Sequence, residues 1–139
     1  MRAMLRAVVV AVGLLLISLA VPVGAHHSFA AEFDANKPLN LTGSVNRLEW
    51  VNPHVWIHIT VKRPTGATEQ WAIEAGTPNT LYRRGITKAM LPLGTEIAVT
   101  GFAAKDGSRR ANGRDLKLAD GRSLFLGSSG TGAPYDQKK

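Results

Sequence analysis

The pattern of apolar and polar residues along the chain predicts an all-β protein. Its clearest strand runs from His54 to Val61, where an aliphatic residue occupies every second position. Alternation with a period of two places the aliphatic side chains on one face of a strand and the remaining side chains on the other. We expect the aliphatic face to lie in the core. The opposite face then carries His54, Trp56, His58 and Thr60.

Further strands are expected on both sides of this one. A first strand begins at Leu39, with Gly43 indicating a bulge or sharp bend, and the Asn52-Pro53 pair marks the turn that follows. Later alternating segments, separated by turn residues, predict the remaining strands. These segments are Glu69 to Ala75, Glu96 to Ala104, Gly113 to Leu118 and Arg122 to Leu126.

One short helix is expected between the third and fourth strands. Thr77 suits the N-cap, Pro78 the first helical position and Gly85 the end of the helix. Three strands, a short helix and two or three further strands follow the order of the OB-fold, a small Greek-key β-barrel. The sequence therefore predicts an OB-like β-barrel of five or six strands over residues 39–126. Another small β-barrel or a β-sandwich is the alternative.

The first 25 residues have the layout of a cleaved signal peptide. Arg2 and Arg6 precede an apolar segment from Ala7 to Val21, which Pro22 ends. A membrane-spanning helix needs about 20 apolar residues, so this segment is short for one. Small residues up to Ala25 predict cleavage after that residue. We therefore expect an exported, periplasmic protein without a transmembrane anchor, and an uncleaved N-terminal anchor is the alternative.

The remaining chain is expected to form one domain with two less regular ends. Removal of 25 of the 139 residues leaves 114, which is enough for a single compact domain. Residues 26–38 are expected to form an N-terminal arm. Residues 127–139 are rich in Gly, Ser and Lys and are expected to be a disordered tail.

Composition favours a binding role over catalysis. The full chain has 17 basic and 10 acidic residues, and loss of Arg2 and Arg6 leaves 15 against 10, a net charge of +5. In an exported protein this charge favours envelope glycans, small anions or protein partners over nucleic acid. The chain has no cysteine, hence no disulfide or thiolate, and it contains no known catalytic motif. We expect a protein that is not an enzyme.

Adjacent histidines at the predicted cleavage site suggest metal binding. Cleavage after Ala25 would place a free amine on His26, next to His27. Copper(II) favours such nitrogen-rich surroundings. His54, at the start of the central strand, is the best candidate for a further ligand. Cleavage one residue earlier would also leave a chelating terminus, and a solvent-exposed polar arm without metal is the alternative.

The outer face of the central strand supports a second hypothesis. Trp56, His58 and Glu74, together with His54, are expected on the face that binds oligonucleotides and oligosaccharides in OB-folds. Such a face suits an envelope glycan, a small anion or a protein partner. Which residues of the third strand lie beside Trp56 depends on the register of the hairpin.

Several segments together resemble a known family. They are HHSF, LTGSV, EWVNPHVWIHI, WAIEAGTPNTLYRRG and GTEIAVTGFAAKDG. This combination is similar to a domain-of-unknown-function family of small exported bacterial proteins, and the resemblance runs from about Ala25 to Phe125. It implies a signal peptide, a periplasmic location and a compact β-rich domain. It implies no activity and no ligand.

Overall fold

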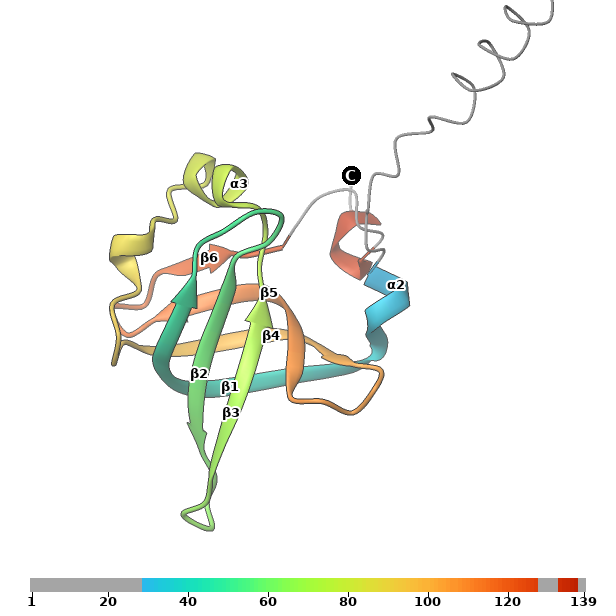
Figure 1. The fold of residues 1–139 in the computed structure, drawn as a ribbon, viewed down its shortest axis with the longest axis vertical. Coiled ribbons are helices and arrows are strands. Elements are labelled where there is room, and N and C mark those ends of the chain that lie inside the picture. Colours follow the sequence, from blue (N-terminus) through green and yellow to red (C-terminus); the bar gives the residue numbers. More distant parts are fainter. Residues whose placement is uncertain (1–28, 128–132, 138–139) are drawn as a thin grey trace, which may run out of the picture.

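The computed structural model describes residues 29–127 and 133–137, and its elements are mostly strands (Figure 1). The strands are β1 (Phe33–Glu49), β2 (Trp56–Lys62), β3 (Thr68–Glu74), β4 (Glu96–Ala104), β5 (Arg110–Leu118) and β6 (Ser123–Phe125). The helices are α2 (Phe29–Glu32), α3 (Pro78–Arg83) and the 3-10 turns η1 (Lys88–Met90) and η2 (Pro134–Gln137). No helix in these two described ranges is both long and apolar enough to cross a membrane.

The strands form one sheet that closes on itself. Their order is β3-β2-β1-β4-β5-β6, and a parallel pairing of β3 with β5 completes a ring of β1 to β5. The short helix α3 lies between β3 and β4 in the chain, with the Thr77 hydroxyl accepting a hydrogen bond from the backbone N–H of Thr80. The prediction of an all-β, OB-like fold with one helix in this position is confirmed.

Strand β1 bends so that it can pair with two neighbours. Its first part pairs with β4 and its last part with β2, and the change of partner falls at Gly43 and Ser44. A Cβ atom on Gly43 would lie 2.4 Å from the carbonyl oxygen of Thr60. Only glycine lets the two backbones approach this closely, which explains the bend that the sequence pattern suggested.

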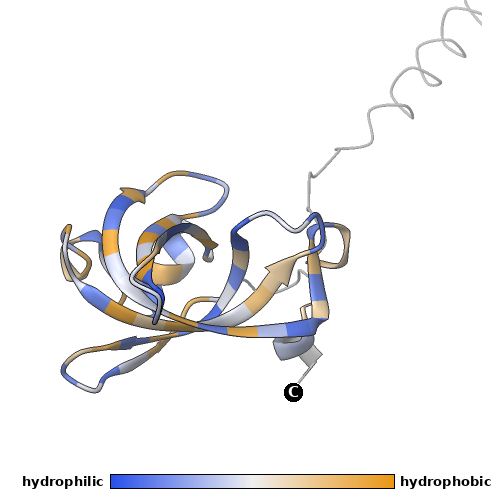
Figure 2. Ribbon diagram, turned by 90° about the horizontal axis from the view of Figure 1, so that it is seen from below, coloured by the Kyte–Doolittle hydropathy of each residue, from blue (hydrophilic) through white to orange (hydrophobic). Residues whose placement is uncertain are grey.

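The core fills the inside of the ring. Val55, Ile57 and Ile59 are fully buried, as the alternation in β2 predicted, and they pack with aliphatic residues of the other strands and of α3. Hydrophobic and hydrophilic residues alternate along the strands in Figure 2. The intervening side chains of β2 therefore point to the outer face, where any binding site of this sheet would lie.

Both ends of the domain differ from the predicted arm and tail. Phe29 and Phe33 are buried, and β1 already begins at Phe33. In the C-terminal segment, Tyr135 of η2 packs against Phe102, with ring centroids 6.5 Å apart. Aromatic side chains thus pack part of the predicted arm and part of the predicted tail against the sheet. Their burial stabilises these segments, whose composition is otherwise polar. The predicted signal peptide and the histidines that follow it lie outside the described residues.

Candidate functional site

One row of residues crosses four strands on the outer face of the ring. Trp56 on β2 lies opposite Glu74 on β3, Glu74 lies opposite Asn112 on β5, and Asn112 lies opposite Phe102 on β4. Residues that face each other in a sheet point to the same side, so each of these side chains is a neighbour of the next one in the row. The hairpin register therefore places Glu74 beside Trp56, and the row joins two of the predicted ligand-face residues to two further residues.

His54 lies at one end of this row, just before β2. Its Nδ1 atom is 3.1 Å from the backbone carbonyl oxygen of Ala75 and 3.9 Å from Oε1 of Glu74. A carbonyl can only accept, so the bond requires a hydrogen on Nδ1. In the neutral ring the lone pair is then on Nε2. The side chain is 18% exposed. His54 is thus held in the tautomer that presents Nε2 to an electrophile.

Glu74 and Asn112 are the buried polar groups of the described residues, with 8% and 4% exposure. The Asn112 amide nitrogen donates to Oε1 of Glu74 over 3.5 Å. The Asn112 amide oxygen accepts a hydrogen bond of 2.6 Å from the hydroxyl of Tyr135. Buried polar groups are costly unless they are hydrogen-bonded, so this network fixes the orientation of each member. It ends at the carboxylate beside His54.

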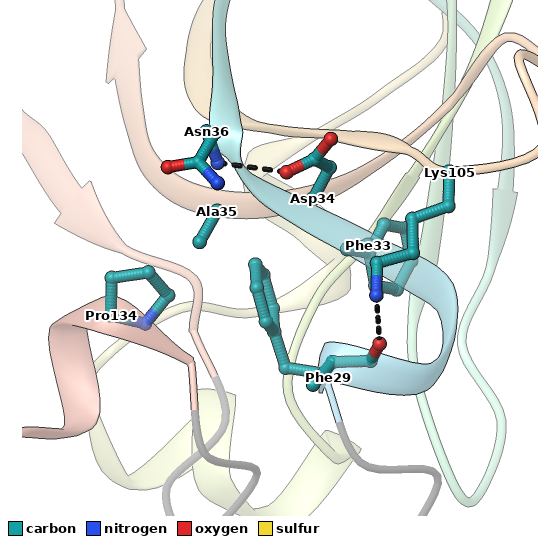
Figure 3. Close-up of a pocket in the computed structure, with 8 residues that line it drawn as sticks. Phe29, Phe33, Asp34, Ala35, Asn36, Lys105 and Pro134 are labelled. Atoms are coloured by element: carbon teal, nitrogen blue, oxygen red, sulfur yellow. Dashed lines mark hydrogen bonds between the residues drawn. The ribbon is translucent and has the colours of Figure 1, made fainter.

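The start of the described chain lies against the same sheet. Glu32 of α2 pairs with Arg110 of β5 over 3.4 Å, and the Lys105 ammonium donates to the carbonyl of Ala30. Phe29 packs edge-on against Phe102, with centroids 5.3 Å apart. The Phe29 ring also borders an open pocket of about 420 Å³, with Pro134 on its far side (Figure 3). Phe29 is therefore anchored at the Phe102 end of the row.

His58 belongs to a separate cluster. Its Nε2 atom lies 3.0 Å from Oε1 of Glu49 and 3.0 Å from Nη2 of Arg47. Arg47 and Glu49 themselves form an ion pair of 2.6 Å. Burial, followed by the positive charge of Arg47, lowers the pKa of His58 below its ordinary value of 6.5, while Glu49 opposes this shift. The predicted ligand-face residue His58 thus has its own partners and is not joined to His54 by any of these bonds.

Arg47→Ala is expected to raise the pKa of His58, because the positive charge is removed while Glu49 remains. NMR titration of the imidazole protons measures this shift. As the pH of the parent protein falls below 6.5, His58 is protonated in the unfolded chain at a higher pH than in the folded protein. The contribution of His58 to stability therefore decreases below that pH. An unchanged or lower pKa in the variant would contradict the assignment of Arg47 as a cause.

Within residues 29–127 and 133–137, no group of three or more His, Asp or Glu side chains is placed to hold a metal ion. The described part of the site offers one imidazole, His54, with Glu74 on its Nδ1 side. Sequence reasoning missed Asn112 because it began that strand at Gly113, and it missed Tyr135 because it assigned that residue to the tail. Neither residue belongs to a recognisable motif.

Comparisons with known proteins give one match. The sequence profile of a family described as having unknown function matches residues 12–113. This range covers most of the chain and contains His54, Glu74 and Asn112, whereas Tyr135 lies beyond it. No curated protein and no solved structure matches the chain.

Proposed function

The chain belongs to DUF6152, a family of unknown function, and from its site we propose that it is an exported protein that binds copper(II) or a similar divalent metal. The ligands in this proposal are the amine of the mature N-terminus, His26 and His27, with His54 completing the site. His26 and His27 lie outside the described residues, so their part rests on the sequence. Binding, rather than catalysis, is the proposed role.

The observation that carries the proposal is the bond from Nδ1 of His54 to the carbonyl oxygen of Ala75, 3.1 Å long. Histidines that ligate a metal generally donate their other ring N–H to a backbone carbonyl or a carboxylate. His54 has both kinds of group on its Nδ1 side, because Glu74 lies 3.9 Å away. A negative charge there favours a cation bound to Nε2.

The proposal requires the predicted N-terminus to reach His54. Along the row, Phe102 and Glu74 are separated by two strand spacings, about 10 Å. Phe29 is anchored on Phe102. A fully extended chain covers at most about 3.5 Å per residue, so two or three residues before Phe29 would reach at most about 7 to 10 Å, before their side chains are counted. These lengths support a site that joins the N-terminal histidines to His54.

The second hypothesis, a ligand face on β2 and β3, is less well supported. Its polar groups already have partners on β1: Asn46 donates to Thr60 over 2.8 Å, and Nε2 of His58 lies 3.0 Å from Oε1 of Glu49. Groups that already have partners gain less from a new ligand, because the existing bonds must first be broken. Trp56 remains the residue of this face that an envelope glycan or protein partner would use.

His54→Ala tests the proposal. The variant is expected to bind copper(II) more than tenfold more weakly than the parent, because a ligand is lost and even the loss of an outer partner of such a ligand costs about 10- to 100-fold. Isothermal titration calorimetry of the mature protein, with its N-terminus verified by intact mass, measures the affinity. His58→Ala is the matched control, since it removes a nearby imidazole on β2 that bonds to Glu49 and Arg47 and not to His54. This control is expected to bind copper with the affinity of the parent.

Two outcomes would overturn the proposal. One is a parent protein with no stoichiometric copper site. The other is an equal loss of affinity in His54→Ala and His58→Ala, which would indicate unspecific binding by surface imidazoles. Circular dichroism melting of both variants shows whether the domain remains folded, so that a loss of binding can be attributed to the missing ligand.

A further inference from the structure

We infer that Tyr135 and Asn112 are positioning residues of the proposed metal site, so that the C-terminal segment forms part of it. This inference rests on the proposed function. Tyr135 fixes the amide of Asn112, Asn112 holds the carboxylate of Glu74, and Glu74 lies on the Nδ1 side of His54. Three segments far apart in the chain, β3, β5 and η2, meet at this network.

The direction of the hydrogen bonds supports this order of residues. An asparagine side chain has one accepting oxygen and one donating NH₂ group. The Tyr135 hydroxyl donates to the oxygen of Asn112, and this bond orients the NH₂ group toward Glu74. If the amide were turned over, its oxygen would face the Glu74 carboxylate and repel it. The phenol hydroxyl therefore selects the amide orientation that supports the carboxylate.

The packing around Tyr135 fixes the position of this hydroxyl. The Tyr135 ring lies edge-on to Phe125, with centroids 5.3 Å apart. A Cβ atom on Gly127 would lie 2.5 Å from the Tyr135 ring, so the chain passes directly against the ring. Arg84 donates to the carbonyl of Gly127 and stacks over Phe125, 4.7 Å from its centroid. The ring is therefore held by contacts that do not involve its hydroxyl.

Because of these contacts, Tyr135→Phe should remove the hydroxyl while the ring keeps its place. Asn112 then loses the partner that selects its orientation, and Glu74 loses part of its support. Outer partners of metal-ligating histidines change metal affinity by about 10- to 100-fold. Since Tyr135 acts through two intermediate residues, we expect a loss at or just below the lower end of this range.

The experiment compares Tyr135→Phe with Tyr82→Phe. Tyr82 lies on α3 and is 72% exposed, so its hydroxyl offers a matched control outside the network. Calorimetric titration with copper(II) is expected to give an affinity about fivefold to tenfold lower for Tyr135→Phe and an unchanged affinity for Tyr82→Phe. The electron paramagnetic resonance spectrum of bound copper is expected to change only in Tyr135→Phe, which a general loss of stability would not produce.

A second measurement without metal separates this inference from the proposed function. Nitrogen NMR of the apoprotein reports which ring nitrogen of His54 carries the hydrogen. In the parent this is expected to be Nδ1, and Tyr135→Phe is expected to increase the fraction with hydrogen on Nε2. An unchanged tautomer in Tyr135→Phe overturns the inference, whether or not the parent binds copper. If the tautomer of His54 changes in Tyr135→Phe while the parent protein binds no copper, the positioning network is supported and the metal site is rejected.

Discussion

Gly43→Ala is expected to lower the free energy of unfolding by about 3 kcal/mol, the upper end of the common range for single substitutions. The added Cβ atom would lie 2.4 Å from the carbonyl oxygen and 2.9 Å from the carbonyl carbon of Thr60. Both are backbone atoms of β2, so no side chain can rotate away. On its other edge, Gly43 pairs with Ile97 of β4, which prevents β1 from moving aside. Urea denaturation followed by circular dichroism measures the loss.

Gly66→Ala is the matched control for this prediction. Gly66 lies in the turn between β2 and β3, and a Cβ atom there would have no neighbour within 4 Å. Its φ of +85° still disfavours alanine, which costs about 1 to 2 kcal/mol. The two variants separate backbone strain from a collision between strands. A loss for Gly43→Ala no larger than that for Gly66→Ala would show that β1 and β2 can separate without cost.

Local patterns predicted the strands well where one face is buried. The strand Glu96–Ala104 has the same bounds in the sequence prediction and in the structure. The first strand was predicted to start too late, because Lys37-Pro38 resembles a break. In the structure Pro38 pairs with Phe102 next to a register shift that follows Phe33. Proline is tolerated at such bulges, and this tolerance depends on the partner strand, which local sequence does not reveal.

The network beside His54 could not be predicted for a related reason. Glu74 and Asn112 are 38 residues apart and meet only through the parallel pairing of β3 with β5. Tyr135 reaches them from a segment with the composition of a disordered tail. A contact of this kind is set by strand order and register rather than by spacing along the chain. The residues on β2, by contrast, shared a face by simple alternation and were assigned to it correctly.

Replacing both His26 and His27 by alanine is expected to weaken copper(II) binding to the mature protein by about 100-fold, the upper end of the range known for changes around metal sites. The proposed site takes most of its nitrogen ligands from this terminus, whereas residues 29–127 and 133–137 contain no group of three ligating side chains that could hold a metal ion by themselves. His54 alone is a single imidazole. Calorimetric titration of parent and variant, each verified by intact mass, measures the difference.

Trp56→Ala is the control variant for this prediction. Trp56 lies opposite Glu74 but offers no metal-ligating atom, so its removal is expected to leave copper affinity unchanged. If instead the double histidine variant binds copper as tightly as the parent, the N-terminal site is wrong. A loss of binding to an envelope glycan in a folded Trp56→Ala protein would then support the outer face of β2 and β3 as the binding surface. The same pair of proteins therefore distinguishes a metal site at the terminus from a ligand site on the sheet.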